Sequence, residues 1–163
     1  MAHGRARSPG PWYVLRVTNT SGDGTAGVRS IGEILAEART RLDRVGPDEA
    51  QAAMSRGAVL VDIRTQAQRA EQGRVPGAIH VERNVLEWRF DPQSPARLPQ
   101  AGYDVQVILF CVDGYASSLA AVDLQKLGLA RATDLDGGFH AWEKAGLPVV
   151  YGDEPANGVV TRA

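Results

Sequence analysis

The stretch "VQVILFCVDGYASSLAAVDLQKLG", residues 105–128, decides the fold of this chain. Its first seven residues are the most apolar short run in the sequence, which predicts a buried strand over 105–111. Residues 117–128 carry apolar side chains at helical spacing and end in Gly128, which predicts a helix. A buried strand that passes through a short turn into a helix is the repeating unit of a parallel α/β sheet.

The rest of the chain repeats this alternation. Ser30 and Glu33 fit a capping box at the start of a helix whose apolar side chains share one face. That face consists of Ile31, Ile34, Leu35, Ala38 and Leu42. We expect further strands over 44–45, 58–63, 77–81 and 132–135, and helices over 30–42, 47–57, 84–88 and 139–146. The predicted fold class is α/β, with three layers (α/β/α) around a central, mostly parallel sheet of about five strands.

The two ends differ from the middle in composition. Residues 1–29 hold four arginines, one acidic residue and the loop-like stretches "SPGP" and "TSGDGTAG". We interpret them as a flexible N-terminal tail; a basic leader that binds a partner is the alternative. Residues 30–150 form the expected folded domain, and 151–163 form a polar C-terminal tail.

The overall composition excludes several classes of protein. The chain has 163 residues, 44% of them hydrophobic and 23% charged, with a net charge of −1. These values are ordinary for one globular domain and favour neither nucleic acid nor membrane as a partner. No apolar run approaches the ~18 residues that span a bilayer. A single cysteine excludes an internal disulfide and a cysteine-rich metal site, and a lone thiol favours a reducing, cytoplasmic location.

That single cysteine, Cys111, lies where the predicted strand ends. Ligands of open α/β sheets bind at the carboxyl ends of the strands. Gly114 allows the loop a positive φ, so that the N–H groups of residues 112–117 can converge near the positive end of the next helix. Helix N-termini lower the pKa of thiols, which makes Cys111 a candidate nucleophile. The alternative is a buried structural cysteine.

Three separated stretches resemble one family. "LVDIRTQAQRAEQGRVPGAIHV" is similar to its Asp-x-Arg strand end and the Gly-x-Ile-Pro-Gly-Ala segment that follows, and "ILFCVDGYASSLAA" to its active-site strand, loop and helix. "DLDGGFHAWEKAGLPV" is similar to its closing Gly-Gly-aromatic-x-x-Trp-x-x-x-Gly-x-Pro signature. In this order and spacing, over about residues 43–150, the chain resembles a single-domain rhodanese of the rhodanese-like sulfurtransferase superfamily.

The resemblance implies an activity. The thiolate of Cys111 would take sulfane sulfur from thiosulfate or from a persulfide or polysulfide, and would then pass it from a Cys111 persulfide to cyanide or a thiol. A protein thiol is a further candidate acceptor. No metal or organic cofactor is implied. The predicted substrate-binding residues of the loop are Val112, Asp113, Gly114, Tyr115, Ala116 and Ser117.

The loop departs from the family pattern in its charges. Ala116 stands where many rhodaneses have an arginine, and Asp113 adds a negative charge that opposes a thiolate and repels dianionic thiosulfate. We expect Ser118 to cap the following helix. Arg83, which follows another predicted strand, is a candidate for the missing substrate-binding cation.

Other polar and aromatic residues have structural interpretations. Asp62 and Arg64 are expected to support the loop through a hydrogen-bonded network with Arg69 or Glu71. We interpret His80 as a core histidine whose ring is hydrogen-bonded. Trp142 is expected to pack in the core.

Two rival functions remain. A phosphatase of the related cell-cycle type needs a longer loop closed by arginine, whereas the sixth residue after Cys111 is Ser117 and residues 112–130 hold no arginine. A catalytically weak rhodanese module, used for protein binding or for persulfide or redox sensing, is favoured by Asp113 and Ala116. Turnover distinguishes an enzyme from such a module.

Overall fold

The computed structural model describes residues 27–152, and most of the two predicted tails lies outside this range. Its strands are β1 (Val59–Asp62), β2 (Ile79–His80), β3 (Val107–Phe110) and β4 (Thr133–Asp134). Its helices are α1 (Ile31–Arg39), α2 (Pro47–Ser55), α3 (Gln66–Gln72), α4 (Leu86–Phe90), α5 (Ala116–Lys126) and α6 (Gly138–Lys144), and a 3₁₀ turn, η1 (Arg83–Val85), precedes α4.

The strands pair in the order β2-β1-β3-β4, and all three pairings are parallel. In the central pairing, Val59 lies opposite Val107 and Asp62 lies opposite Phe110. Parallel strands that are joined through helices place all their carboxyl ends at one edge of the sheet. Cys111 follows β3 directly, so it lies at that edge beside the ends of both neighbouring strands.

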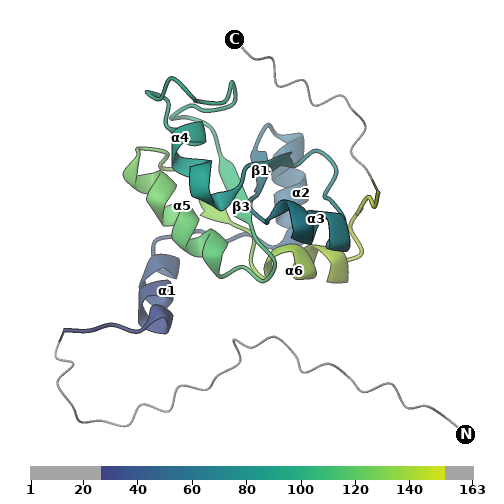
Figure 1. Ribbon diagram of the computed structural model, residues 1–163, viewed down its shortest axis with the longest axis horizontal. Coiled ribbons are helices and arrows are strands. Elements are labelled where there is room, and N and C mark those ends of the chain that lie inside the picture. The colour runs from purple at the N-terminus through teal and green to yellow at the C-terminus, as the bar shows by residue number, and fades with distance from the viewer. Residues whose placement is uncertain (1–26, 153–163) are drawn as a thin grey trace, which may run out of the picture.

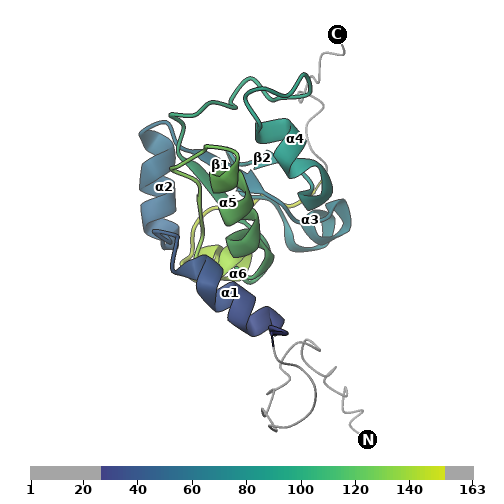
Figure 2. The same cartoon turned by 90° about the vertical axis from the view of Figure 1, so that its left-hand side faces the viewer.

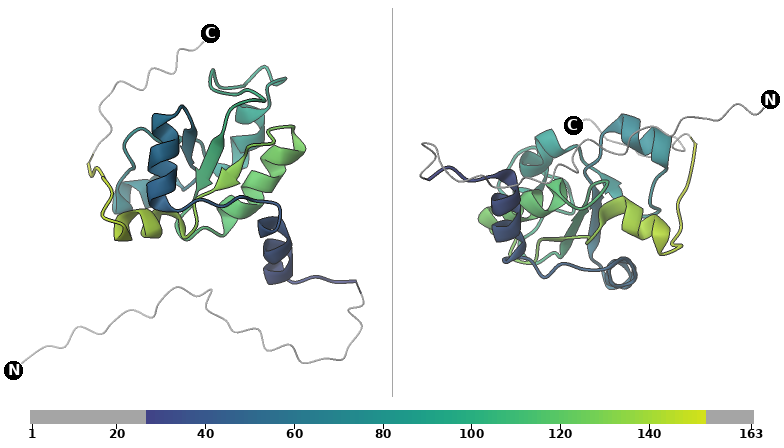
Figure 3. Two further views of the ribbon diagram at one scale, coloured as in Figure 1. Left: turned by 180° about the vertical axis from the view of Figure 1, so that it is seen from behind. Right: turned by 90° about the horizontal axis from the view of Figure 1, so that it is seen from below.

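Alternate residues of the strands enter two separate cores, one on each face of the sheet. Val61 and Leu109 pack with the side chains of α4 and α5. Leu60 and Ile108 pack with those of α2 and α6. Figures 1 and 3 show the resulting layers, with α4 and α5 on one side of the sheet and α2 and α6 on the other. The predicted three-layer α/β/α architecture is confirmed.

The predicted number of strands was slightly wrong. Within residues 27–152 the sheet has four strands, and the predicted strand at 44–45 is only an isolated bridge between Val45 and Leu135. The N–H of Val45 donates to the carbonyl of Asp134, and the carbonyl of Val45 accepts from the N–H of Asp136. Pro47 then begins α2, which leaves no room for a longer ladder.

The first helix has the predicted capping box but only half of the predicted buried face. The hydroxyl of Ser30 accepts from the N–H of Glu33, whose carboxylate accepts from the N–H of Ser30. Ala38 is buried, whereas Ile31 is 68% exposed and Ile34 is 41% exposed. Figure 2 shows why: only the last turns of α1 lie against the body of the domain, and its start extends beyond it.

One helix has no counterpart among the predictions. Helix α3 begins after Thr65, whose hydroxyl accepts from the N–H of Gln68, while the Gln68 side chain accepts from the N–H of Thr65. This second capping box was the available sequence signal. Within residues 27–152, no helix combines the length and the apolar character needed to cross a bilayer.

Candidate active site

Cys111 is half-buried at the mouth of the turn between β3 and α5. Helix α5 begins at Ala116, so its N-terminus opens beside the turn. Gly114 is buried and has a φ of +77°, which confirms the predicted left-handed turn. A Cβ atom there would lie 3.0 Å from the amide nitrogen of Gly137 and 3.1 Å from the carbonyl oxygen of Leu135. Glycine is therefore required by both conformation and space.

The first amide groups of helix α6 donate hydrogen bonds to the cysteine loop. The N–H of Phe139 donates to the carbonyl of Cys111 over 2.9 Å, and the N–H of His140 donates to that of Val112 over 3.1 Å. Gly138 makes this approach possible, because a Cβ atom on it would lie 2.6 Å from the Cys111 carbonyl oxygen and 2.7 Å from the amide nitrogen of Gly114. The double glycine of the closing signature thus seats the cysteine loop.

A buried polar network lies behind the thiol. The hydroxyl of Ser117 lies 3.4 Å from the Cys111 sulfur and donates to the carboxylate of Asp134 over 3.1 Å. The hydroxyl of Ser118 reaches the same oxygen of Asp134 at 2.7 Å and the Gly114 carbonyl at 3.1 Å. The expectation that Ser118 caps α5 was wrong: the helix begins two residues earlier, so this side chain lies inside the first turn.

Arg44 compensates the buried charge of Asp134. Its guanidinium donates to both carboxylate oxygens, at 2.8 and 3.1 Å, and to Asp136 at 2.6 Å. Burial by itself would lower the pKa of Arg44, but the hydrogen bonds and charges of Asp134 and Asp136 outweigh it, and the pKa is raised. Arg44 therefore stays cationic at any pH at which the protein folds. It also donates to the Gly114 carbonyl over 3.2 Å.

Asp113 does not face the thiol as an isolated charge. One of its carboxylate oxygens lies 2.6 Å from Nδ1 of His140 on α6. When the imidazole is protonated, the contact becomes an ion pair that offsets the negative charge of the loop. The neighbouring Tyr115 is 52% exposed, and Ala116 is also exposed.

Asp62 and Arg64 form the predicted buried network, and it includes Arg69. Arg64 donates to Asp62 at 2.7 Å, and the guanidinium of Arg69 lies 3.3 Å from the same carboxylate. The Arg64 guanidinium also stacks 3.9 Å over the ring of Phe139, the residue whose amide holds Cys111. These residues thus reach the loop through α6.

The structure places the other predicted residues as follows. Arg83 lies on η1, and its guanidinium contacts Glu87 at 2.6 Å and Asp123 at 2.8 Å, so two carboxylates already surround it. Its role in substrate binding stays a prediction. His80 is only half-buried, so it is not the core residue that was predicted, but its ring is hydrogen-bonded as expected, with Nε2 2.8 Å from the carbonyl oxygen of Arg64. Trp142 is buried, as expected for a core residue.

Four residues around the loop were not among the predicted site residues: Arg39, Arg44, Asp134 and His140. Arg39 donates to the Gly114 carbonyl over 2.8 Å. A signal was available for Asp134 and His140, which both lie in the stretch that resembles the closing signature. The others have no local pattern that distinguishes them from surface charges.

Fold and site together define a class: a parallel α/β domain with a single thiol in a turn at the carboxyl edge of its sheet. The family model of the rhodanese-like domain matches residues 46–145. The chain therefore belongs to the rhodanese-like domain family, as its motifs predicted.

Relatives with assigned names agree with this membership. The chain is 37% identical to the thiosulfate sulfurtransferase GlpE of Pseudomonas fluorescens, over 63% of this chain and 86% of that protein. It is 29% identical to GlpE of Pseudomonas savastanoi pv. phaseolicola, over 73% of this chain and 99% of that protein. Among solved structures, a protein of unknown function from Rhodopseudomonas palustris, described as a possible tyrosine phosphatase, is 33% identical with a TM-score of 0.69. That match covers 79% of this chain and 100% of the other.

Proposed function

We propose that this protein is a rhodanese-type sulfurtransferase in which Cys111 carries the transferred sulfur. The observation that carries the proposal is the orientation of the loop backbone. The carbonyls of Cys111, Val112 and Gly114 all accept hydrogen bonds from α6 or from the arginine side chains. In a trans peptide the N–H points opposite to the C=O. The N–H groups of the following residues therefore turn away from those donors, as a cradle for a terminal sulfur anion requires.

The reaction has two displacements. The Cys111 thiolate attacks the outer sulfur of thiosulfate, the S–S bond of the donor breaks, and sulfite leaves with the electron pair. The Cys111 persulfide remains. Cyanide or a thiolate then attacks its terminal sulfur, forming thiocyanate or a new persulfide, and the Cys111 thiolate is regenerated. A persulfide or polysulfide donor loads Cys111 by the same displacement.

The residues around the loop have separate parts in this scheme. The loop amides of residues 112–117 bind the donor and the persulfide, and Ser117 keeps its hydroxyl at the reacting sulfur. The substrates of this site are a small sulfur donor and an acceptor that is cyanide or a thiol. A thiol of another protein is a larger candidate acceptor. A thiolate nucleophile of this kind works in a reducing compartment, and we propose the cytoplasm.

A phosphatase is the candidate raised by the description of the Rhodopseudomonas relative. A phosphate ester carries a dianion, which phosphatase loops bind through a bidentate arginine. This loop offers Asp113 and Ala116 instead, with no arginine from 112 to 130. Sulfur transfer is therefore favoured, and p-nitrophenyl phosphate serves as a control substrate.

The test is the intact mass of the reduced protein after incubation with thiosulfate or, separately, with polysulfide. We expect a gain of one sulfur, about 32 daltons, that cyanide or dithiothreitol removes and that Cys111→Ser does not acquire. Thiocyanate should then accumulate catalytically when donor and cyanide are both present.

Four outcomes would contradict the proposal. Loading without turnover would favour the sensing or binding module. A folded protein that neither donor loads, or Cys111→Ser with undiminished turnover, would exclude Cys111 as the sulfur carrier. Hydrolysis of p-nitrophenyl phosphate at a rate above that of Cys111→Ser would favour the phosphatase.

A further inference from the structure

Two arginine side chains reach the cysteine loop from residues that precede the match to the family model. The loop residues 112–117 include one acidic and no basic side chain. Two guanidinium groups nevertheless meet at the Gly114 carbonyl, those of Arg39 at 2.8 Å and Arg44 at 3.2 Å. Both arginines precede residue 46, where the match to the family model begins.

Arg39 makes contacts at both ends of the turn. Its Nη2 donates to the Gly114 carbonyl, and its Nε donates to the hydroxyl of Ser118 over 3.3 Å. The guanidinium also lies 5.4 Å from the centre of the Tyr115 ring. One planar, rigid fork thus connects the left-handed glycine of the loop to the first turn of α5.

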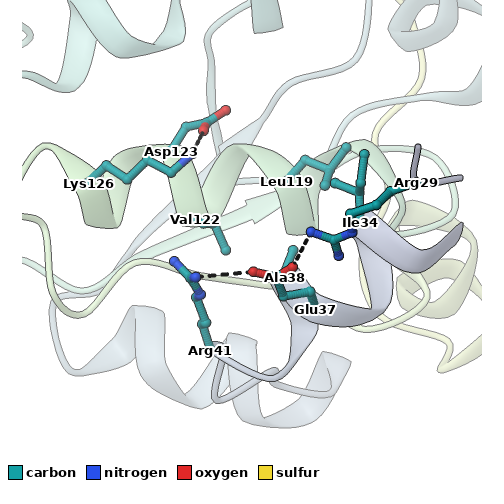
Figure 4. Close-up of a pocket in the computed structure, with 9 residues that line it drawn as sticks. All are labelled: Arg29, Ile34, Glu37, Ala38, Arg41, Leu119, Val122, Asp123 and Lys126. Carbon is teal, nitrogen blue, oxygen red and sulfur yellow. Dashed lines mark hydrogen bonds and ion pairs between the residues drawn. The ribbon is translucent and has the colours of Figure 1, made fainter. Parts of the chain in front are cut away.

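Helix α1 fixes Arg39 in this position. Ala38, the residue before it, is buried in the same core as Val122 and Leu119 of α5. Figure 4 shows α1 lying along α5, with the ion pairs of Glu37 to Arg29 and Arg41 at the edge of the groove between the two helices. The last turn of α1 is therefore anchored on α5, and Arg39 extends from it to the loop.

We propose that Arg39 is a positioning residue of the cysteine loop, and that α1 is thereby a working part of the active site. Arg39 holds the Gly114 carbonyl so that it points toward the guanidinium, which fixes the peptide plane between Gly114 and Tyr115. The N–H of Tyr115 belongs to the same trans peptide and therefore points away from Arg39. Arg44 donates to the same carbonyl, but its guanidinium is held by Asp134 and it lies after the end of α1. The contact of the Gly114 carbonyl that depends on α1 is therefore the one from Arg39. This inference rests on the proposed sulfur transfer only where it is tested by the rate at which Cys111 is loaded with sulfur.

The test compares Arg39→Ala and Arg39→Lys with Arg41→Ala. Arg41 is the matched control because it lies two residues further along, pairs with Glu37 and is exposed. The first readout is the rate of sulfur loading of Cys111 over a range of donor concentrations. The second is the rate of Cys111 alkylation by iodoacetamide, which needs no sulfur transfer. The third is thermal unfolding.

We expect Arg39→Ala to lower the saturating loading rate about tenfold, with a smaller change in the half-saturating donor concentration, because misplaced catalytic groups lose rate steeply. Alkylation should slow as well. Arg39→Lys should recover only part of the rate, since one ammonium does not span the two acceptors. Arg41→Ala should match the unaltered protein.

The proposal is overturned if Arg39→Ala equals Arg41→Ala in loading and alkylation, or if its losses only match its unfolded fraction at the assay temperature. If no donor loads the unaltered protein, the proposed function fails, and the alkylation rates alone decide the role of Arg39.

Discussion

At the scale of single residues, the loop has a charge balance that differs from what its own six residues predict. Asp113 lies two positions after Cys111, and its negative charge opposes both a thiolate and a dianionic donor. The structure adds His140 at 2.6 Å from that carboxylate and Arg39 and Arg44 at the Gly114 carbonyl. Asp113 remains the acidic group of the loop whose removal should favour an anionic donor.

We therefore expect Asp113→Asn to increase the rate of Cys111 loading by thiosulfate several-fold at low ionic strength. Asparagine keeps the size of the side chain and its hydrogen bonding to His140 while removing the charge. The measurement is the loading rate at low and at high salt, because screening weakens such repulsion.

Asp104→Asn is the control, since Asp104 is an exposed carboxylate on a distant segment before β3. Equal loading rates for Asp113→Asn and the unaltered protein, at both salt concentrations, would show that loop charge does not limit the use of thiosulfate.

At the scale of elements, α6 acts as the seat of the cysteine loop, and its first residue sets how closely they approach. Gly138 has a φ of +60°, and three backbone atoms of the loop surround the position of its absent Cβ at 2.6–2.7 Å. Backbone atoms held by hydrogen bonds cannot move aside as a flexible side chain can. We therefore expect the packing of α6 against the loop to matter for catalysis as well as for stability.

We expect Gly138→Ala to destabilise the fold clearly more than Gly146→Ala and to reduce sulfur loading at least tenfold. Gly146 also has a positive φ, +71°, but no atom lies within 4 Å of its Cβ position. The free energy of unfolding of Gly146→Ala should fall only by the cost of the left-handed conformation, about 1 kcal/mol.

The free energy of unfolding of Gly138→Ala should fall by about 2 kcal/mol more than that, because the added methyl group overpacks the site. Urea unfolding and the loading assay measure the two effects. The same loss of stability in both variants, with normal loading, would mean that the close approach of α6 is not needed.

The capping box of α1 predicts a pH dependence at the same scale. The pKa of Glu33 is lowered, first by the backbone N–H of Ser30 and then by its hydroxyl. Because the folded pKa lies below the unfolded value of 4.5, this stabilisation is present above 4.5 and is lost as the pH falls through the folded pKa. We expect the amide signals of the first turn of α1 to broaden or shift below pH 4.5 in an NMR titration.

Glu33→Gln is the control, because glutamine keeps a side-chain acceptor for Ser30 but does not titrate. Glu37 is the other carboxylate of α1 with a lowered pKa, chiefly because of its hydrogen bond from Arg29, and it still titrates in this variant. An unchanged titration in Glu33→Gln would contradict the assignment.

At the scale of the whole molecule, the Asp62–Arg64 pair connects three elements. Asp62 ends β1, and Arg64 donates to the carbonyl of Gly73 after α3 and stacks on Phe139 of α6. Both side chains are buried. Removing one partner leaves a buried charge whose main partner is gone.

We expect Arg64→Ala to lower the free energy of unfolding by about 3–5 kcal/mol. The exposed Arg56→Ala is the control and should stay within about 0.5 kcal/mol of the unaltered protein. Urea denaturation followed by circular dichroism measures both. A loss below about 1 kcal/mol for Arg64→Ala would show that the network is dispensable to the fold.

Much of the fold was predictable because its signals are local. The apolar run of β3, the capping box at Ser30 and the positive φ of Gly114 each depend on residues within a few positions of one another. Where the outcome depends on distant packing, prediction failed: Val45 gained only a bridge to Leu135, and Ile31 and Ile34 stayed exposed because the start of α1 reaches past α5.

By itself, the sequence determined the α/β class and the position of the thiol at a strand end, because periodicity and turn chemistry are written in neighbouring residues. Its three motifs indicated the family through their resemblance to known rhodaneses. Only the tertiary structure decided what surrounds that thiol. Arg44 meets Asp134 across 90 positions of the chain, and Arg39 meets Gly114 across 75. Such contacts arise when separate strands and helices assemble at one edge of the sheet, and no local pattern identifies which charged side chains will meet there.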